Sequence, residues 1–306
     1  MKVITITLNP AFDVHCDIEA FEMHKENYAT SYIKHAGGKG INISRALTKY
    51  GIDNIACCVV GNENGKEFLS KLDKDNMEYK AITVEGRIRE NITVHTENKE
   101  TRISFEGFDI NETVLCDFYN EIKSESDKDT VVTFTGRLPK GVEKDAVIEV
   151  LRKIKATGAR LIVDCNSFSL DDLIQIEPYL IKPNEEEIEK LVGKKICNDV
   201  MGIAREIYQK GIKNVIISLG GDGFVYCGEW GEYEIKTPEI AVISTIGAGD
   251  SLISGFVSGL CEGIEPIDIL IRSAAFGTAA CMEEGTNPPS KEKVELIEQK
   301  IKKSLL

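Results

Sequence analysis

The chain has 306 residues, of which 42% are hydrophobic and 28% are charged, a composition typical of soluble globular proteins. Its net charge of −13 argues against nucleic acid or an anionic membrane surface as a partner. No run approaches the ~18 apolar residues that cross a membrane, and the start of the chain does not resemble a signal peptide. Nine cysteines without a CxxC pair favour a reducing compartment, so we expect a cytoplasmic protein.

The first predicted element is a buried strand over residues 3–8, where β-branched and apolar residues alternate. The strand leads through Asn9 and Pro10 to Asp13. A carboxylate just past the end of a strand lies where α/β sheets bind ligands. Taken alone, however, Asp13 is explained more simply as a turn residue after a proline.

Two short strand patterns, over 14–18 and 28–33, precede a glycine-rich segment. This segment, residues 36–42, places three glycines around Lys39 at the start of an amphipathic helix. Such a helix start offers backbone amides to an anion, and Lys39 adds positive charge. Asn42, in the first turn, is placed to hydrogen-bond a sugar hydroxyl. The alternative is a flexible loop with a solvated lysine.

Further strands are predicted over residues 54–60, 79–84, 87–96 and 100–105, with a helix around Phe68 between the first two. The last two strands form a hairpin with a tight turn at 97–99. Together, segments 14–35 and 87–106 are predicted to form a small sheet, a lid over the mouth of the main sheet. Arg89 and Arg102 lie on these lid strands. They either clamp a phosphate or are solvated surface charges, and in isolation the second explanation is the simpler.

From residue 112 onwards, strands and helices alternate regularly. Helices are predicted over about 112–125, 143–157, 170–176, 198–210, 266–284 and 291–304, and strands over 131–135, 161–164, 179–181, 215–219, 224–227 and 230–236. The absence of a linker or repeat favours a single domain over residues 1–306. This alternation predicts a parallel sheet covered by helices.

Residues 182–187, Lys-Pro-Asn-Glu-Glu-Glu, are predicted to begin a further helix. Asn184 and Glu187 are three residues apart and therefore share a helix face. Such a pair can organise the water shell of Mg²⁺, which prefers oxygen ligands and keeps several waters. Acidic residues at a helix N-terminus also complement the helix dipole, so a purely structural role stays open.

The central motif is Ser-Thr-Ile-Gly-Ala-Gly-Asp-Ser over residues 244–251. It follows a strand pattern at 240–244 and opens a buried helix. Gly247 and Gly249 let the backbone approach a ligand closely, and the free amides of a helix start attract anions. Asp250 beside an anion site makes sense if it takes a proton from a hydroxyl that attacks a phosphate. On the octapeptide alone, an ordinary turn capped by Asp250 is equally good.

Six segments, in the order of the chain, resemble the ribokinase-like sugar kinases. They are residues 7–13, 36–42, 136–141, 182–187, 218–223 and 244–250. Within that family the chain looks most like the 1-phosphofructokinases, with the tagatose-6-phosphate kinases close behind. The resemblance covers essentially the whole chain and implies a three-layer α/β/α fold with a mostly parallel central sheet and a small β lid.

The resemblance implies an ATP-dependent, Mg²⁺-assisted kinase that phosphorylates D-fructose 1-phosphate to fructose 1,6-bisphosphate. The alternative substrate is D-tagatose 6-phosphate, which would give tagatose 1,6-bisphosphate. A more distant alternative is a non-catalytic sugar-phosphate sensor, against which the intact Asp250 argues. Because lid strands in this family often pair between subunits, the resemblance also implies a homodimer.

The resemblance assigns a role to each matching residue. Asp250 would be the base, and the amides of Gly247, Ala248 and Gly249 would form the anion hole. The sugar phosphate would contact Asp13, Gly38, Lys39, Asn42, Arg89, Asn91 and Arg102. The nucleotide would contact Lys182, Asn184, Ser218, Gly220, Gly223, Thr245, Gly277 and Thr278, and Mg²⁺ would lie by Asn184 and Glu187, bound through water.

One position departs from the family pattern. Arg137 stands where the family usually has a small serine before Leu-Pro. A guanidinium there either adds a contact to the substrate phosphate or changes the substrate preference.

Overall fold

A nine-stranded sheet forms the centre of the molecule in the computed structural model, which describes residues 1–97, 99–196 and 199–304. Its strands, from one edge to the other, are β13 (Gly231–Ile235), β12 (Phe224–Gly228), β11 (Asn214–Ser218), β10 (Leu180–Ile181), β9 (Arg160–Asp164), β8 (Thr130–Thr135), β1 (Lys2–Thr7), β4 (Ile55–Gly61) and β5 (Tyr79–Val84). The strands from β11 to β5 are parallel, and β12 and β13 add an antiparallel edge. The predicted parallel sheet is confirmed.

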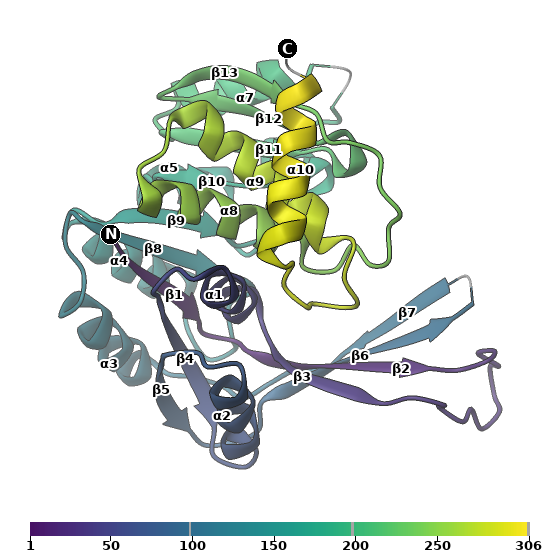
Figure 1. The fold of residues 1–306 in the computed structure, drawn as a ribbon. Coiled ribbons are helices and arrows are strands. Elements are labelled where there is room, and N and C mark those ends of the chain that lie inside the picture. Colours follow the sequence, from purple (N-terminus) through teal and green to yellow (C-terminus); the bar gives the residue numbers. More distant parts are fainter. Residues whose placement is uncertain (98, 197–198, 305–306) are drawn as a thin grey trace.

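Helices cover both faces of this sheet (Figure 1). One face carries α1 (Lys39–Tyr50), α8 (Ala248–Glu262), α9 (Pro266–Ala280) and α10 (Lys291–Ser304); the other carries α3 (Glu112–Lys123), α4 (Lys144–Lys155), α5 (Leu170–Ile176), α6 (Glu185–Val192) and α7 (Val200–Gln209). A further helix, α2 (Gly65–Lys74), packs against β4. Apolar side chains fill a core on each face of the strands, as expected for a parallel sheet. The three-layer α/β/α architecture is confirmed.

Helix α8 is the most buried helix of its layer, with every residue from 250 to 260 buried. Its small residues make this possible. A Cβ on Gly255 would stand 2.7 Å from the carbonyl oxygen of Arg272 on α9. The prediction of a central, closely packed helix after the glycine motif is therefore confirmed, and α8 holds its first turn rigidly against the sheet.

A separate four-stranded sheet projects from the main body (Figure 1). Its strands, in spatial order, are β3 (Ile33–Gly37), β2 (Ala11–Asp17), β6 (Arg89–Thr96) and β7 (Lys99–Ser104). We call this sheet the lid. Its inner residues begin beside the end of β1, because only three residues separate β1 from β2. The expected small β lid is thus present.

Several local predictions were wrong. The strand expected at 28–33 begins only at Ile33. The residues before it bond to Asp17 at the end of β2 through a turn: the Thr30 amide donates to the Asp17 carbonyl oxygen at 2.8 Å, and the Ser31 hydroxyl accepts from the Asp17 amide at 3.2 Å. The strand expected at 240–244 is irregular, since the amides of Ile243 and Ser244 both donate to one carbonyl, that of Cys281. Part of the turn expected at 97–99 and the first residue of the helix expected at 198–210 lie outside the described residues. The helix expected to reach residue 284 ends at Ala280.

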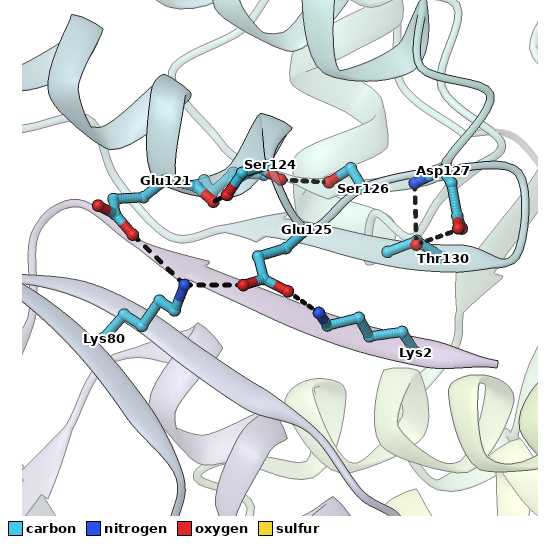
Figure 2. A network of polar contacts seen from close by, with 9 residues as sticks. Lys2, Lys80, Glu121, Ser124, Glu125, Ser126, Asp127 and Thr130 are labelled. Carbon is cyan, nitrogen blue, oxygen red and sulfur yellow. Dashed lines mark hydrogen bonds and ion pairs between the residues drawn. The ribbon is translucent and has the colours of Figure 1, made fainter.

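A chain of ion pairs lies at the end of the sheet where β1 begins (Figure 2). Glu125, just after α3, binds Lys2 of β1 and Lys80 of β5, and Lys80 also lies 3.3 Å from Glu121. These side chains are partly exposed, so each pair contributes less than about 1 kcal/mol. The network ties α3 to two strands and stabilises the fold at the end opposite the site described below. None of the described helices has the length and apolarity of a membrane span.

Candidate active site

A cavity of about 520 Å³ opens where β1, β8 and β9 end, under the base of the lid. The strand order changes direction here, because β4 lies on one side of β1 and β8 on the other. Ligands of open α/β sheets bind at such points. Fifteen of the predicted site residues line this cavity: Asp13, Gly38, Lys39, Asn42, Arg89, Asn91, Arg102, Arg137, Lys182, Asn184, Glu187, Thr245, Gly247, Gly249 and Asp250.

The charge of the cavity differs from that of the chain. Its described lining has five basic and four acidic side chains, in a protein with a net charge of −13. Positive charge is therefore concentrated at this cavity, as an anionic ligand requires.

Asp250 lies in the first turn of α8 and faces this cavity, only 6% exposed. Its Oδ2 accepts a hydrogen bond of 2.9 Å from Nδ2 of Asn42 on α1. Burial raises the pKa of Asp250 from its ordinary value to about 6, although Lys39 and the Asn42 hydrogen bond oppose the rise. A carboxylate of this kind is ionised at neutral pH but accepts a proton more readily than a solvated aspartate.

The amides at the start of α8 lie beside Asp250. Gly247 precedes the helix with φ at 80°, a left-handed conformation that favours glycine, and has no side chain to cap the helix. The first amides of a helix lack internal acceptors and attract anions. The Lys182 amine reaches this place too, since its Nζ would stand 3.1 Å from a Cβ on Gly249. Glycine at position 249 therefore leaves room for the Lys182 ammonium group beside the free amides of α8.

Behind these groups, a buried carboxylate pairs with one lysine and feels the charge of a second. Asp164, at the end of β9, accepts a hydrogen bond of 2.9 Å from Nζ of Lys39. Burial alone would raise the pKa of Asp164, but the charges of Lys182 and Lys39 hold it below its ordinary value. Burial likewise disfavours the charge on Lys39, yet Asp164 and Asp250 raise its pKa above the ordinary value. Both groups therefore stay charged at neutral pH.

On the lid side, three guanidinium groups and one carboxylate line the cavity. Asp13 accepts a 2.9 Å hydrogen bond from Asn91 and lies 3.6 Å from Arg102. Arg89 has a buried Nε without a hydrogen-bond partner, and burial lowers its pKa, with Arg102 and Arg137 contributing. Arg137 is exposed at the rim. Asp13 lies within lid strand β2, because β2 begins at Ala11, and not in a turn after β1 as expected.

Asn184 and Glu187 belong to a capping box at the start of α6. The Asn184 side chain accepts from the Glu187 amide at 2.8 Å, and Glu187 Oε2 accepts from the Asn184 amide at 3.0 Å. Both residues also line the cavity. One Glu187 oxygen is not used by the cap and fits a magnesium ion that keeps most of its own waters. No group of three or more His, Cys, Asp or Glu with metal-binding geometry occurs among the described residues, so protein ligands to such an ion would be few.

The remaining predicted residues lie outside the cavity. Ser218 ends β11 and bridges to Asn184, and Gly220 and Gly223 form the turn that follows. Ala248 starts α8, and its carbonyl oxygen lies 3.3 Å from where a Cβ on Gly277 of α9 would stand. Gly277 therefore packs against the start of α8, and none of these remaining residues lines the cavity.

Sequence reasoning missed some residues that line the cavity, among them Asp164, Asn166 and Thr286. Asp164 could have been found, because it is a carboxylate at the end of a buried strand, the argument already applied to Asp13. Thr286 lies in a loop without periodicity, and no sequence pattern pointed to it.

The family model of the pfkB family carbohydrate kinases matches residues 7–293, and the chain belongs to this family. A tagatose-6-phosphate kinase of Staphylococcus epidermidis is 28% identical over 304 residues, 98% of each chain. A 1-phosphofructokinase of Borreliella burgdorferi is 31% identical over 284 residues, 92% of each. Phosphofructokinase-2 of Escherichia coli, crystallised with substrates and products, superimposes with a TM-score of 0.92 at 25% identity, covering 99% of this chain and 100% of that one.

The protein is therefore a sugar-phosphate kinase, a phosphotransferase that acts on a sugar hydroxyl with ATP as co-substrate.

Proposed function

We propose that the protein transfers the γ-phosphoryl group of ATP to D-fructose 1-phosphate, giving fructose 1,6-bisphosphate and ADP. The observation that carries this proposal is the cavity in which Asp250, free helix amides and the lid arginines face one another. The 31% identity to a 1-phosphofructokinase supports the choice of sugar. D-Tagatose 6-phosphate is the second candidate, supported by the 28% identity to a tagatose-6-phosphate kinase.

In the proposed mechanism, Asp250 accepts the proton of the attacking sugar hydroxyl. The bond from that oxygen to the γ-phosphorus forms as the bond from phosphorus to the β-γ bridging oxygen breaks, and ADP leaves. The amides of Gly247, Ala248 and Gly249 hold the transferring group, and Lys182 neutralises its charge. Mg²⁺, held through water by Asn184 and Glu187, would supply further charge neutralisation.

The other groups position the two substrates. Gly38, Lys39 and Asn42 bind the sugar beside Asp250, and Asp13 with Asn91 orients it from the lid. Arg89, Arg102 and Arg137 bind its existing phosphate, for which guanidinium groups are suited. Ser218, Gly220, Gly223, Thr245, Gly277 and Thr278 are proposed to contact the nucleotide.

ADP release should be measured with fructose 1-phosphate, fructose 6-phosphate and tagatose 6-phosphate as acceptors, each at saturating MgATP. The proposal predicts the highest kcat/KM for fructose 1-phosphate. A higher kcat/KM for tagatose 6-phosphate would overturn the choice of sugar while leaving the kinase mechanism intact. If no ADP is released with any of the three sugar phosphates, the result would favour a non-catalytic sugar-phosphate sensor.

We further propose that the chain is a single kinase domain that forms a homodimer through the lid. Large apolar side chains on and beside the lid are exposed, including Tyr28 at 76%, Met23 at 69% and Tyr32 at 64%. All three lie in the loop that joins lid strands β2 and β3, and exposed apolar side chains gathered in one segment are typical of a protein interface. Light scattering should give the mass of two chains, and the mass of one chain would refute the dimer.

A cytoplasmic location is proposed from the eight free cysteines among the described residues, which suit a reducing compartment. The net charge of −13 supports the absence of nucleic-acid and membrane partners. Fractionation of cells that produce the protein tests the location.

A further inference from the structure

A chain of side-chain contacts runs from the surface of α2 to Asp250. Oδ2 of Asp75, the residue that caps the C-terminus of α2, lies 2.7 Å from Nε of Arg45 on α1. Arg45 Nη1 donates to Oδ1 of Asn42 at 3.4 Å, and Asn42 Nδ2 donates to Oδ2 of Asp250 at 2.9 Å. Arg45 and Asn42 are three residues apart and share a face of α1. Asn42 lines the cavity, whereas Arg45 lies behind it.

This arrangement determines how the Asn42 amide is oriented. An arginine side chain only donates hydrogen bonds, so the amide atom that faces Arg45 must be the oxygen. The amide nitrogen then faces Asp250, where it can donate to a carboxylate. In the reverse orientation, the amide oxygen would face the carboxylate and the nitrogen would face the guanidinium. Both contacts would then be repulsive.

Arg45 is itself held from three sides. It is 8% exposed, and besides Asp75 and Asn42 its Nη2 donates to the carbonyl oxygen of Ala36, at the base of the lid. A guanidinium makes these contacts at once because its donors form a rigid planar fork, whereas a lysine amine is a single point. The position of Arg45 is therefore set by α1, α2 and lid strand β3 together.

We propose that Arg45 is a positioning residue for phosphoryl transfer: by fixing the Asn42 amide, it keeps an N–H donor on Oδ2 of Asp250. Oδ1 of Asp250 is then the oxygen that faces the sugar hydroxyl. The inference rests on the proposed role of Asp250 as the base. It adds a residue that touches neither substrate and acts through Asn42.

The other charged groups that face Asp250 are Lys39 of α1, Asp164 at the end of β9 and Lys182 after β10. Substitution of Arg45 leaves these three in place. A change in the pH dependence of turnover would therefore report on the Asn42 hydrogen bond.

The test is the pH profile of kcat for Arg45→Lys, measured with MgATP and whichever sugar phosphate the wild type turns over fastest. The acid limb is the part of the profile in which kcat falls with falling pH as the base is protonated. Loss of the ordered N–H donor should move this limb to higher pH by about one unit, so that kcat at a pH below it is about tenfold lower than in the wild type. The ionisation of the substrate phosphates is common to both proteins and cancels in the comparison. KM for ATP should change less than about twofold, since Arg45 does not line the cavity.

Four further proteins make the test specific: Asn42→Ser with and without Arg45→Lys, and the single variants of Asp75 and Arg272. In an Asn42→Ser background, Arg45→Lys should move the acid limb no further, because the residue through which it acts is gone. Asp75→Asn, which frees one anchor of Arg45 at the surface, should move the limb in the same direction by less. Arg272→Lys is the matched control: Arg272 is also a largely buried arginine between two carboxylates, those of Glu262 and Glu298, and its substitution should not move the limb.

An unmoved limb in folded Arg45→Lys, or an equal shift in the Asn42→Ser background, would overturn the inference. If Arg45→Lys does not fold, Asp75→Asn decides, and an unmoved limb there counts against Arg45. Failure of the base assignment is separate, because it would appear as near-normal turnover of Asp250→Asn.

Discussion

Replacing the proposed base should make the protein more stable at neutral pH. Asp250 is buried, and its pKa is raised from 3.8 to about 6. The folded state therefore binds a proton at this site more tightly than the unfolded chain does. Ionising Asp250 in the folded protein costs free energy, and Asp250→Asn removes that cost because asparagine is neutral and nearly the same shape.

The magnitude follows from the pKa difference. The shift is about two units, and each unit corresponds to about 1.4 kcal/mol, so the cost is at most about 3 kcal/mol. Between pH 4 and pH 6 the folded state holds more protons at Asp250 than the unfolded state. The cost is therefore absent below about pH 4, grows up to about pH 6 and is complete above that. Asp250→Asn should raise the free energy of unfolding by about 2–3 kcal/mol at pH 8 and by little at pH 4.

Urea unfolding of both proteins at several pH values measures this difference. Comparing the two removes the contributions of all other titrating groups that they share. Asp164→Asn is a control of opposite sign. The pKa of Asp164 is held below its ordinary value, so its charge stabilises the fold at every pH above that ordinary value, and the substitution should lower the free energy of unfolding there. An Asp250→Asn protein that is no more stable at pH 8, or whose gain persists undiminished at pH 4, would refute the reasoning.

Three further predictions concern activity. Asp250→Asn should lower kcat by about 10²–10⁴-fold with little change in ATP affinity, measured by ADP release and calorimetry; near-normal turnover would contradict the assignment. Gly37→Ala should raise KM for the sugar phosphate, because the new Cβ would stand 2.0 Å from Oδ2 of Asp13, whereas Gly221→Ala meets nothing within 4 Å and should leave KM unchanged. Arg137→Ser should raise that KM about tenfold at low salt and less at high salt, with kcat nearly constant; a KM independent of this substitution would exclude a phosphate contact.

The magnesium proposal is tested separately. Chelation with excess EDTA should abolish ADP release, and added Mg²⁺ should restore it. Glu187→Gln should raise the Mg²⁺ concentration needed for half-maximal activity, because it removes the charge that holds the ion's waters. An unchanged Mg²⁺ requirement in a folded Glu187→Gln protein would contradict the assigned role.

Much of the fold could be predicted because it rests on local patterns. The alternation of apolar strands with amphipathic helices was sufficient for a parallel, helix-covered sheet, and the helix after Gly247 was predicted from its glycines and apolar run. Predictions of strands failed where the backbone amides of a segment donate to a loop or turn and not to a neighbouring strand of a sheet. At Ile243 an apolar pattern suggested a strand. Its side chain is exposed, and its amide donates to the carbonyl oxygen of Cys281 rather than to a neighbouring strand.

The sequence by itself determined which chemical groups are available: a glycine-flanked Asp250, a lysine between glycines, and arginines on the predicted lid strands. These groups can be recognised from the sequence because each depends on residues that are close together in the chain. Such neighbours restrict the local backbone conformation and place charges beside it. Only the tertiary structure decided that Asp164 pairs with Lys39 and that Asn42 lies between Arg45 and Asp250. Such contacts join residues up to 208 positions apart, and their partners are chosen by how the layers pack.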